Sequence, residues 1–264
     1  MSNSPHPEFN YLPVTSWRYL PSTGSTNNDA IMWANEHAPD MALVVADQQT
    51  KGRGRADHTW VTNPGGALAF SLVLRPTQVE IPFINRFTAL AALALVRALK
   101  NVYHLTAQIK WPNDVLLMNK KVAGILVETQ WDEHDTNAIV LGMGVNVSSG
   151  SIPILKGFRI QPTCVEESFG EKIDRWQLLG QILTEIIAIR RIMPTSQFIS
   201  LWNASLAFRG KSVTIHAPSG KSQQAIVLDV SENGSLLVKR EDEIPLEIFA
   251  GELEVSYNLN HGRD

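Results

Sequence analysis

Three strand-like runs follow one another closely in residues 114–147, which read DVLLMNKKVAGILVETQWDEHDTNAIVLGMGVNV. The runs are Asp114–Met118, Val122–Gln130 and Ala138–Val147. The short polar links between them favour an antiparallel meander. Glycine recurs at Gly142 and Gly144, and because side chains alternate along a strand, both glycines leave the same face bare. A flat ligand could pack on that face; a bulge or a tightly crossed strand is the alternative.

Further elements can be predicted on both sides of this meander. Upstream, Ala42–Ala46 and Leu68–Leu74 have the length of buried strands, and Ile84–Lys100 has the length and composition of a helix. Downstream, Trp176–Arg191 has the pattern of an amphipathic helix. After Phe208, short strands alternate with turn signals, which is typical of a small barrel-like β unit. The sequence therefore predicts an α+β catalytic domain over residues 1–207 and a small β domain over residues 208–264.

Composition excludes several classes of protein. The chain has 264 residues, of which 44% are hydrophobic, enough for a sizeable core. Its net charge of -3 argues against a protein whose main task is to grip nucleic acid. The single cysteine, Cys164, excludes an internal disulfide and a cysteine-built zinc site. Neither a secretory signal nor an apolar run of membrane-spanning length stands out, so we expect a cytoplasmic protein with no membrane partner.

A short cationic segment, Lys51-Gly52-Arg53-Gly54-Arg55, is the sharpest local feature. Its glycines allow backbone N–H groups to approach a ligand closely, and its arginines supply planar donors for phosphate or carboxylate. The segment connects two predicted buried strands, a position suited to closing over an anion. The alternatives are a solvated basic loop and an arm that contacts nucleic acid.

Two other segments combine suitable polar groups. Lys110-Trp111-Pro112-Asn113-Asp114 brings a lysine, an amide and a carboxylate together, a plausible set for a nucleotide and Mg²⁺, or alternatively a capped surface turn. Ser25-Thr26-Asn27 offers an N-cap for a helix over Asp29–Asn35, or hydroxyl and amide groups for an uncharged ligand. In Lys120-Lys121, nothing local singles out either lysine.

Taken in order, these segments resemble the motifs of the biotin–protein ligases. The motifs are Ser25-Thr26-Asn27, Gln49 with Gly52-Arg53-Gly54-Arg55 and Trp60, Lys110–Asp114, Lys121–Glu128 and Gly142–Asn146. The resemblance implies a mixed-sheet catalytic domain followed by an SH3-like barrel. It also implies that biotin reacts with ATP to form biotinyl-5′-adenylate, which then acylates a lysine of a biotin carboxyl carrier domain of a carboxylase. A lipoate-type ligase and a non-catalytic binding module are the alternatives.

The resemblance also implies roles for individual residues. Those implied for biotin are Ser25, Thr26, Asn27, Gln49, Gly52, Arg53, Gly54, Arg55, Trp60, Lys121, Gly124, Gly142 and Gly144, with Trp60 closing over the ligand and Gly142 and Gly144 lying under its rings. Those implied for ATP are Arg53, Arg55, Lys110, Asn113, Asp114 and Asn146, with Asp114 also a candidate for Mg²⁺. Lys121, Arg53 and Arg55 are the implied catalytic groups.

Two features depart from the family pattern. The loop continues as Arg55-Ala56-Asp57-His58, where the family commonly has another glycine. In addition, Ser25-Thr26-Asn27 begins too early for the N-terminal DNA-binding domain that some members carry. We therefore expect a short form that binds no operator, as a monomer or homodimer.

The two adjacent lysines, Lys120 and Lys121, provide a test of how this sequence is aligned with the family motif. We expect Lys121→Ala to remove most adenylate formation while leaving the fold intact, because Lys121 falls on the position that touches the biotin carboxylate. Lys120→Ala, the matched control, should do little. Biotin-dependent exchange of labelled pyrophosphate into ATP measures the step, and greater sensitivity at Lys120 would show that this alignment is wrong.

Overall fold

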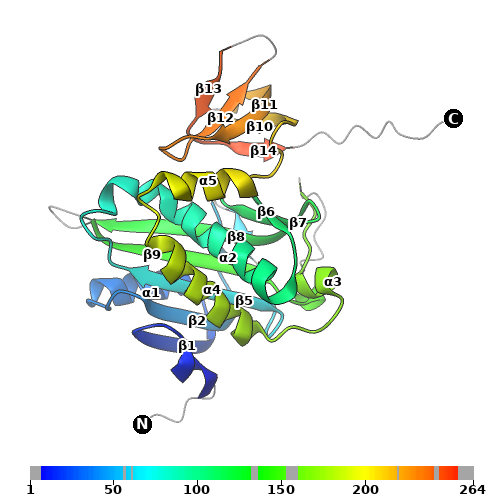
Figure 1. Ribbon diagram of the computed structural model, residues 1–264. Coiled ribbons are helices and arrows are strands. Elements are labelled where there is room, and N and C mark those ends of the chain that lie inside the picture. Colours follow the sequence, from blue (N-terminus) through cyan, green and yellow to red (C-terminus); the bar gives the residue numbers. More distant parts are fainter. Residues whose placement is uncertain are drawn as a thin grey trace.

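A mixed seven-stranded sheet forms the centre of the computed structural model, which describes residues 7–55, 58–60, 62–131, 136–152, 160–218, 220–240 and 244–254. The strand order is β1-β2-β5-β9-β8-β7-β6 (Figure 1). The strands are β1 Ser16–Thr23, β2 Ala42–Gln49, β5 Ala67–Leu74, β6 Ala107–Lys110, β7 Asp114–Leu117, β8 Lys120–Trp131 and β9 Thr136–Asn146. Only the β1–β2 pair is parallel among the described pairs of this sheet.

The predicted meander is confirmed, because β7, β8 and β9 pair antiparallel in succession. The two edge strands, β1 and β6, were missed by the sequence analysis. Strand β1 contains Pro21 and is only partly buried, so it lacks a clear hydrophobic alternation. Strand β6 has four residues, too few for a periodic pattern to stand out.

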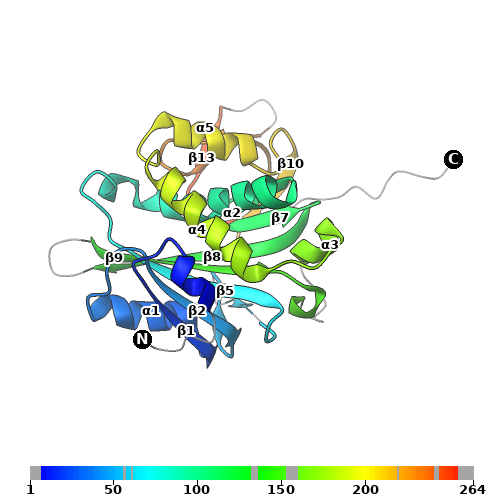
Figure 2. The same ribbon diagram turned by 60° about the horizontal axis from the view of Figure 1, so that its bottom comes forward.

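Helices cover both faces of this sheet (Figure 2). On one face, α2 (Phe87–Tyr103) and α4 (Arg175–Arg190) pack against the alternate side chains of β5, such as Leu68, Phe70 and Leu72. On the other face, the small residues of α1 (Thr26–Asn35) pack against Val73 of β5. Because α1 has only ten residues, it covers part of its face and leaves the rest for other groups.

The most apolar helical segment lies inside the protein. A 3₁₀ helix, Ile81–Arg86, leads directly into α2, so the prediction of a helix beginning at Ile84 spans the junction of two elements. The combined segment Ile81–Tyr103 is long and apolar enough to cross a membrane by length and composition. Its side chains are instead largely buried against the sheet and α4, as expected for a core helix.

A second sheet of five antiparallel strands follows α5 (Ser196–Ser205), with the order β13-β12-β11-β10-β14 (Figure 1). Its strands are β10 Ser212–His216, β11 Ser222–Val230, β12 Leu236–Lys239, β13 Leu246–Ile248 and β14 Glu252–Glu254. The predicted small β unit is therefore present, with β14 as a strand that the sequence analysis missed. Among the described residues no pairing joins β13 to β14, so a closed barrel stays a prediction.

Buried polar contacts join the two sheets at the turn between β11 and β12. The guanidinium of Arg86, 2% exposed, donates to the carbonyl oxygens of Glu232 at 2.8 Å and Met193 at 2.6 Å. It also pairs with the Glu232 carboxylate at 2.9 Å. The indole Nε1 of Trp111 donates to the carbonyl oxygen of Gly234 at 3.0 Å. The turn therefore depends on donors supplied by the larger domain.

Arg86→Met should lower the free energy of unfolding by about 2–4 kcal/mol, because it leaves buried carbonyl groups without donors. Urea denaturation followed by circular dichroism measures the change. Arg18→Met, which breaks an exposed pair with Glu36 at 3.3 Å, is the control and should cost less than about 1 kcal/mol. Equal effects of the two substitutions would contradict the structural role given to Arg86.

Candidate functional site

A cavity of about 570 Å³ lies on the sheet face that α1 leaves partly uncovered. It brings together sixteen of the seventeen residues singled out from the sequence. These are Ser25, Thr26, Asn27, Gln49, Arg53, Gly54, Arg55, Trp60, Lys110, Asn113, Asp114, Lys121, Gly124, Gly142, Gly144 and Asn146. The remaining one, Gly52, supports the cavity from behind, because its backbone pairs with Trp60 between the short strands β3 (Gly52–Arg53) and β4 (Thr59–Trp60).

The bare face predicted for β9 is present, and the chain's own side chains lie directly on it. A Cβ atom at Gly142 would lie 1.9 Å from Oδ1 of Asn27, and one at Gly144 would lie 2.3 Å from Cε2 of Trp60. Asn27 and Trp60 therefore form the inner surface of the cavity above these glycines. The predicted packing of biotin rings in this region then involves the indole and the amide as well as the strand.

One end of the cavity is lined mainly by hydroxyl and amide groups. Ser25 occupies the N-cap position of α1, but its side chain makes no capping hydrogen bond. The backbone N–H and the hydroxyl of Thr26 both donate to Oε1 of Gln49, at 2.8 and 3.0 Å. The hydroxyl oxygen of Ser71 of β5, a buried residue that the sequence analysis missed, lies 2.8 Å from the hydroxyl oxygen of Thr26. These contacts fix Thr26 and Gln49 relative to the sheet.

The opposite end is cationic. Nζ of Lys121 lies 2.6 Å from Oδ1 of Asp114, and Nζ of Lys110 lies 3.3 Å from Oδ2 of the same carboxylate. Burial opposes ionisation of Asp114, but the two lysines outweigh it and hold the pKa of this carboxyl below its usual value. Asp114 therefore stays ionised between two ammonium groups, and the cluster keeps one net positive charge. Lys120 lies outside this cluster, 3.2 Å from Glu167 on the surface.

Two amide side chains at this end hold the backbone. Nδ2 of Asn113 donates to the carbonyl oxygen of Ile125 at 2.9 Å, and Nδ2 of Asn146 donates to that of Thr163 at 3.0 Å. Each contact fixes a segment beside the cationic cluster. The predicted nucleotide contacts of both asparagines remain predictions.

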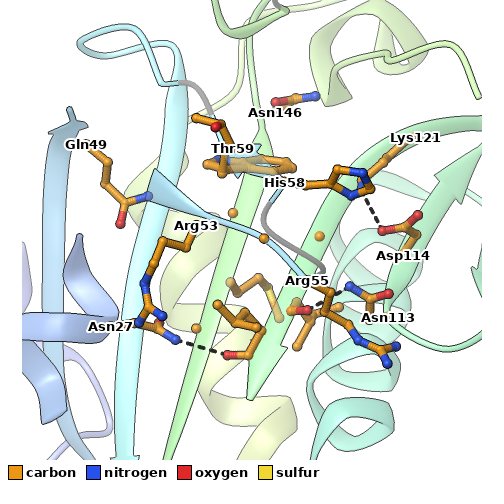
Figure 3. A pocket seen from close by; sticks show the side chains of 18 of the residues that line it. Asn27, Gln49, Arg53, Arg55, His58, Thr59, Asn113, Asp114, Lys121 and Asn146 are labelled. Carbon is orange, nitrogen blue, oxygen red and sulfur yellow. Dashed lines mark hydrogen bonds and ion pairs between the residues drawn. The ribbon is translucent and has the colours of Figure 1, made fainter. Parts of the chain in front are cut away.

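The two arginines of the glycine-rich segment extend in different directions (Figure 3). Arg55 lies beside Asn113, near the cationic end, whereas Arg53 lies beside Asn27. Nη2 of Arg53 lies 2.7 Å from Oε2 of Glu128. The sequence analysis treated the two arginines alike, because spacing alone cannot show which way each side chain turns. Ala56 and Asp57, where the loop departs from the family pattern, lie outside the described residues.

Several lining residues were missed by the sequence analysis. Leu126 lies two residues after Gly124 on β8, and side chains two residues apart share a strand face. The period-two pattern of that strand therefore indicated that Leu126 would line the cavity. Glu252 lines the cavity from the second sheet, and its carboxylate lies 3.8 Å from Nδ1 of His58. No local signal connects a residue so far along the chain to the cavity.

This arrangement suits an elongated ligand with a polar ring system at one end and an anionic group at the other. Hydroxyl and amide groups lie at one end, an indole lies in between, and two lysines and Arg55 lie at the far end. Within the described residues, no group of three or more His, Cys, Asp or Glu side chains could hold a metal ion. Because both oxygens of Asp114 already contact lysines, these residues do not fit a resident Mg²⁺. A contact between Asp114 and an Mg²⁺ that arrives with a nucleotide stays a prediction.

Sequence comparisons relate the chain to known ligases. Residues 19–146 match the profile of the Biotin/lipoate A/B protein ligase family. The "Bifunctional ligase/repressor BirA" of Bacillus spizizenii is 31% identical over 240 residues, which cover 90% of this chain and 73% of that protein. The "Biotin--[acetyl-CoA-carboxylase] ligase" of Paracoccus denitrificans is 31% identical over 225 residues, which cover 83% of this chain and 92% of that protein.

A solved structure has the same fold. The biotin protein ligase of Aquifex aeolicus in complex with biotin and ATP superposes with a TM-score of 0.75 and 25% sequence identity. The match covers 91% of this chain and 98% of that one. The likeness therefore extends over both sheets.

Gly142→Ala should weaken the binding of biotin, the ligand that the sequence resemblance implies, by at least about tenfold, or 1.4 kcal/mol. The added methyl would displace the side chain of Asn27 from the cavity wall. Calorimetric titration with biotin measures the change. Gly180→Ala in α4 is the matched control, because its methyl would meet only Leu12 at 3.4 Å. Unchanged affinity in a folded Gly142→Ala protein would contradict this account of the cavity wall.

Proposed function

Because this chain belongs to the biotin/lipoate A/B protein ligase family, and within it to the biotin protein ligases, we propose that its cavity binds biotin with the ureido ring at the polar end. The chain is an ATP-dependent ligase that activates biotin as biotinyl-5′-adenylate and transfers it to a lysine of a carrier domain. The observation that carries the proposal for the site is the division of one cavity into an end rich in hydroxyl and amide groups, where the charge of Arg53 is paired with Glu128, and a cationic end. Biotin has the matching division between its ureido ring and its carboxylate.

The first half of the reaction joins two anions. An oxygen of the biotin carboxylate attacks the α-phosphorus of ATP, the bond to the bridging oxygen breaks, and pyrophosphate leaves with the bonding electrons. Lys121, Lys110 and Arg55 offset the charge that accumulates around phosphorus. Asp114 holds the two lysines in place, so their positions need not change as the reaction proceeds. Mg²⁺ enters as part of the substrate MgATP, whose phosphate oxygens supply much of its coordination.

The second half forms an amide bond. The neutral ε-amine of the carrier lysine attacks the carbonyl carbon of the mixed anhydride, AMP leaves, and the amine loses a proton. This step needs no covalent intermediate on the enzyme, because the adenylate is already activated. Water would hydrolyse the same carbonyl. The side chains of Trp60 and Arg55, both on the cavity lining, are suited to excluding water from the adenylate.

The carrier we propose is the biotin carboxyl carrier domain of a carboxylase, in the cytoplasm. The names of the relatives support this choice, since the Paracoccus denitrificans protein is called an acetyl-CoA-carboxylase ligase. The second sheet contributes Glu252 to the cavity. The turn between its strands β11 and β12 accepts a hydrogen bond from Trp111, the residue that follows Lys110 in the chain. These contacts support a role for that sheet in positioning ATP or the carrier.

Incubation of the protein with biotin, MgATP and a carrier domain, followed by avidin blotting, tests the function. We expect biotinylation that requires ATP and the carrier lysine, and no modification of a carrier in which that lysine is arginine. Lipoate in place of biotin should give no transfer, which separates the biotin ligase from a lipoate-type ligase. Folded protein that binds the carrier but transfers no biotin would favour a binding module instead.

A further inference from the structure

The carboxylate of Glu128 joins a rigid part of the site to a loosely supported one. Glu128 lies on β8, on the strand face that also carries Gly124 and Leu126. Its Oε2 accepts from Nδ2 of Asn27 at 2.7 Å and from Nη2 of Arg53 at 2.7 Å, and the same nitrogen lies 3.0 Å from Oε1. One carboxylate therefore connects helix α1, strand β8 and strand β3.

The Asn27 side of this contact is firmly held. Asn27 is 5% exposed, and its Oδ1 accepts from the buried hydroxyl of Ser71 at 2.6 Å. Its Nδ2 also donates to the carbonyl oxygen of Leu126 at 3.2 Å. With Gly142 directly beneath it, the amide has no room to shift toward the sheet. Asn27 therefore fixes Glu128 in the direction of Arg53.

The Arg53 side belongs to a small hairpin. Strands β3 and β4 form a two-stranded sheet of their own, and the described residues include no strand pairing between it and either large sheet. At the base of the hairpin, the N–H of Lys51 donates to the carbonyl oxygen of Gly24 at 2.8 Å. Beyond that base, the side chain of Arg53 is a polar tie from β3 to β8, since it reaches Glu128 as well as Oδ1 of Asn28 at 2.8 Å.

The charge of Arg53 is balanced by this contact. A guanidinium paired with a carboxylate contributes little net potential to a distant anion. The positive charge at the far end of the cavity comes instead from Lys110, Lys121 and Arg55, and Figure 3 places Arg53 on the side of Asn27. The two arginines of one short segment thus have different tasks.

We propose that Glu128 is a positioning residue that latches the β3–β4 hairpin over the cavity by holding the guanidinium of Arg53. The proposal rests on the proposed function for the identity of the ligand, biotin. The latch itself is a property of the ligand-free protein. Because Trp60 belongs to β4 of the same hairpin, closure through Arg53 also sets the position of the indole over Gly144.

Tryptic cleavage of the ligand-free protein tests the latch directly, because the hairpin segment carries Lys51, Arg53 and Arg55 as cleavage sites. Glu128→Gln keeps the size of the side chain and removes its charge, and we expect cleavage in this segment to become about three- to tenfold faster. Glu36→Gln, which neutralises the carboxylate of the exposed Arg18–Glu36 pair, is the matched control and should leave the rate unchanged. An unchanged rate in Glu128→Gln would overturn the proposal.

Kinetics with the two substrates supply a second readout. Glu128→Gln should raise the KM for biotin by a similar factor and leave the KM for ATP unchanged, since Arg53 is assigned to the hairpin and not to the phosphates. Tighter binding of biotin would overturn the proposal, because it would mean that Glu128 competes with the ligand for Arg53. A protein without any biotin transfer would refute the proposed function, while the cleavage rates would still decide the latch.

A double-mutant cycle shows whether the two residues act as a unit. Arg53→Gln alone should reproduce the faster cleavage after Lys51 and Arg55, and adding Glu128→Gln should change it little further. Arg53→Lys, which retains the charge, should restore part of the protection. Fully additive effects in the double variant would contradict a shared contact.

Discussion

A strip of sheet without side chains is the constraint on which this site depends. At Gly142 and Gly144 the backbone of β9 is open, and Asn27 and Trp60 occupy the space that any Cβ would take. The amide and the indole therefore lie closer to the sheet than ordinary packing allows. Helix α1 covers the sheet only as far as this strip, and the β3–β4 hairpin covers the part beyond it. The cavity therefore forms where the layer of helices on this face of the sheet is incomplete.

The cationic end solves a different problem, the burial of positive charge. Two lysines placed side by side without a counter-ion would repel each other and would favour the neutral amine. Asp114 accepts from both, and its lowered pKa means that the carboxylate persists as an anion among them. The cluster therefore presents fixed charge to an incoming anion without a carboxylate left free to repel it.

Local patterns in the sequence predicted the meander and the long helices, whereas most of the polar residues of the cavity were chosen through the resemblance to the biotin–protein ligases. The sequence analysis missed β1, whose edge position weakens its pattern, and it missed Ser71, which looks like an ordinary strand residue. It also treated Arg53 as the equal of Arg55. The direction of a side chain depends on partners such as Glu128 that lie far along the chain, and a single sequence does not specify that pairing.

The hydrogen bond from Trp111 to Gly234 links the small sheet to a residue whose covalent neighbour is Lys110. The turn between β11 and β12 is thus connected through Trp111 to the charged end of the cavity. We expect substitutions in that turn to shift the ammonium group of Lys110, although the turn itself is not part of the described cavity lining. Such a change would reach Lys110 through Trp111 and the backbone.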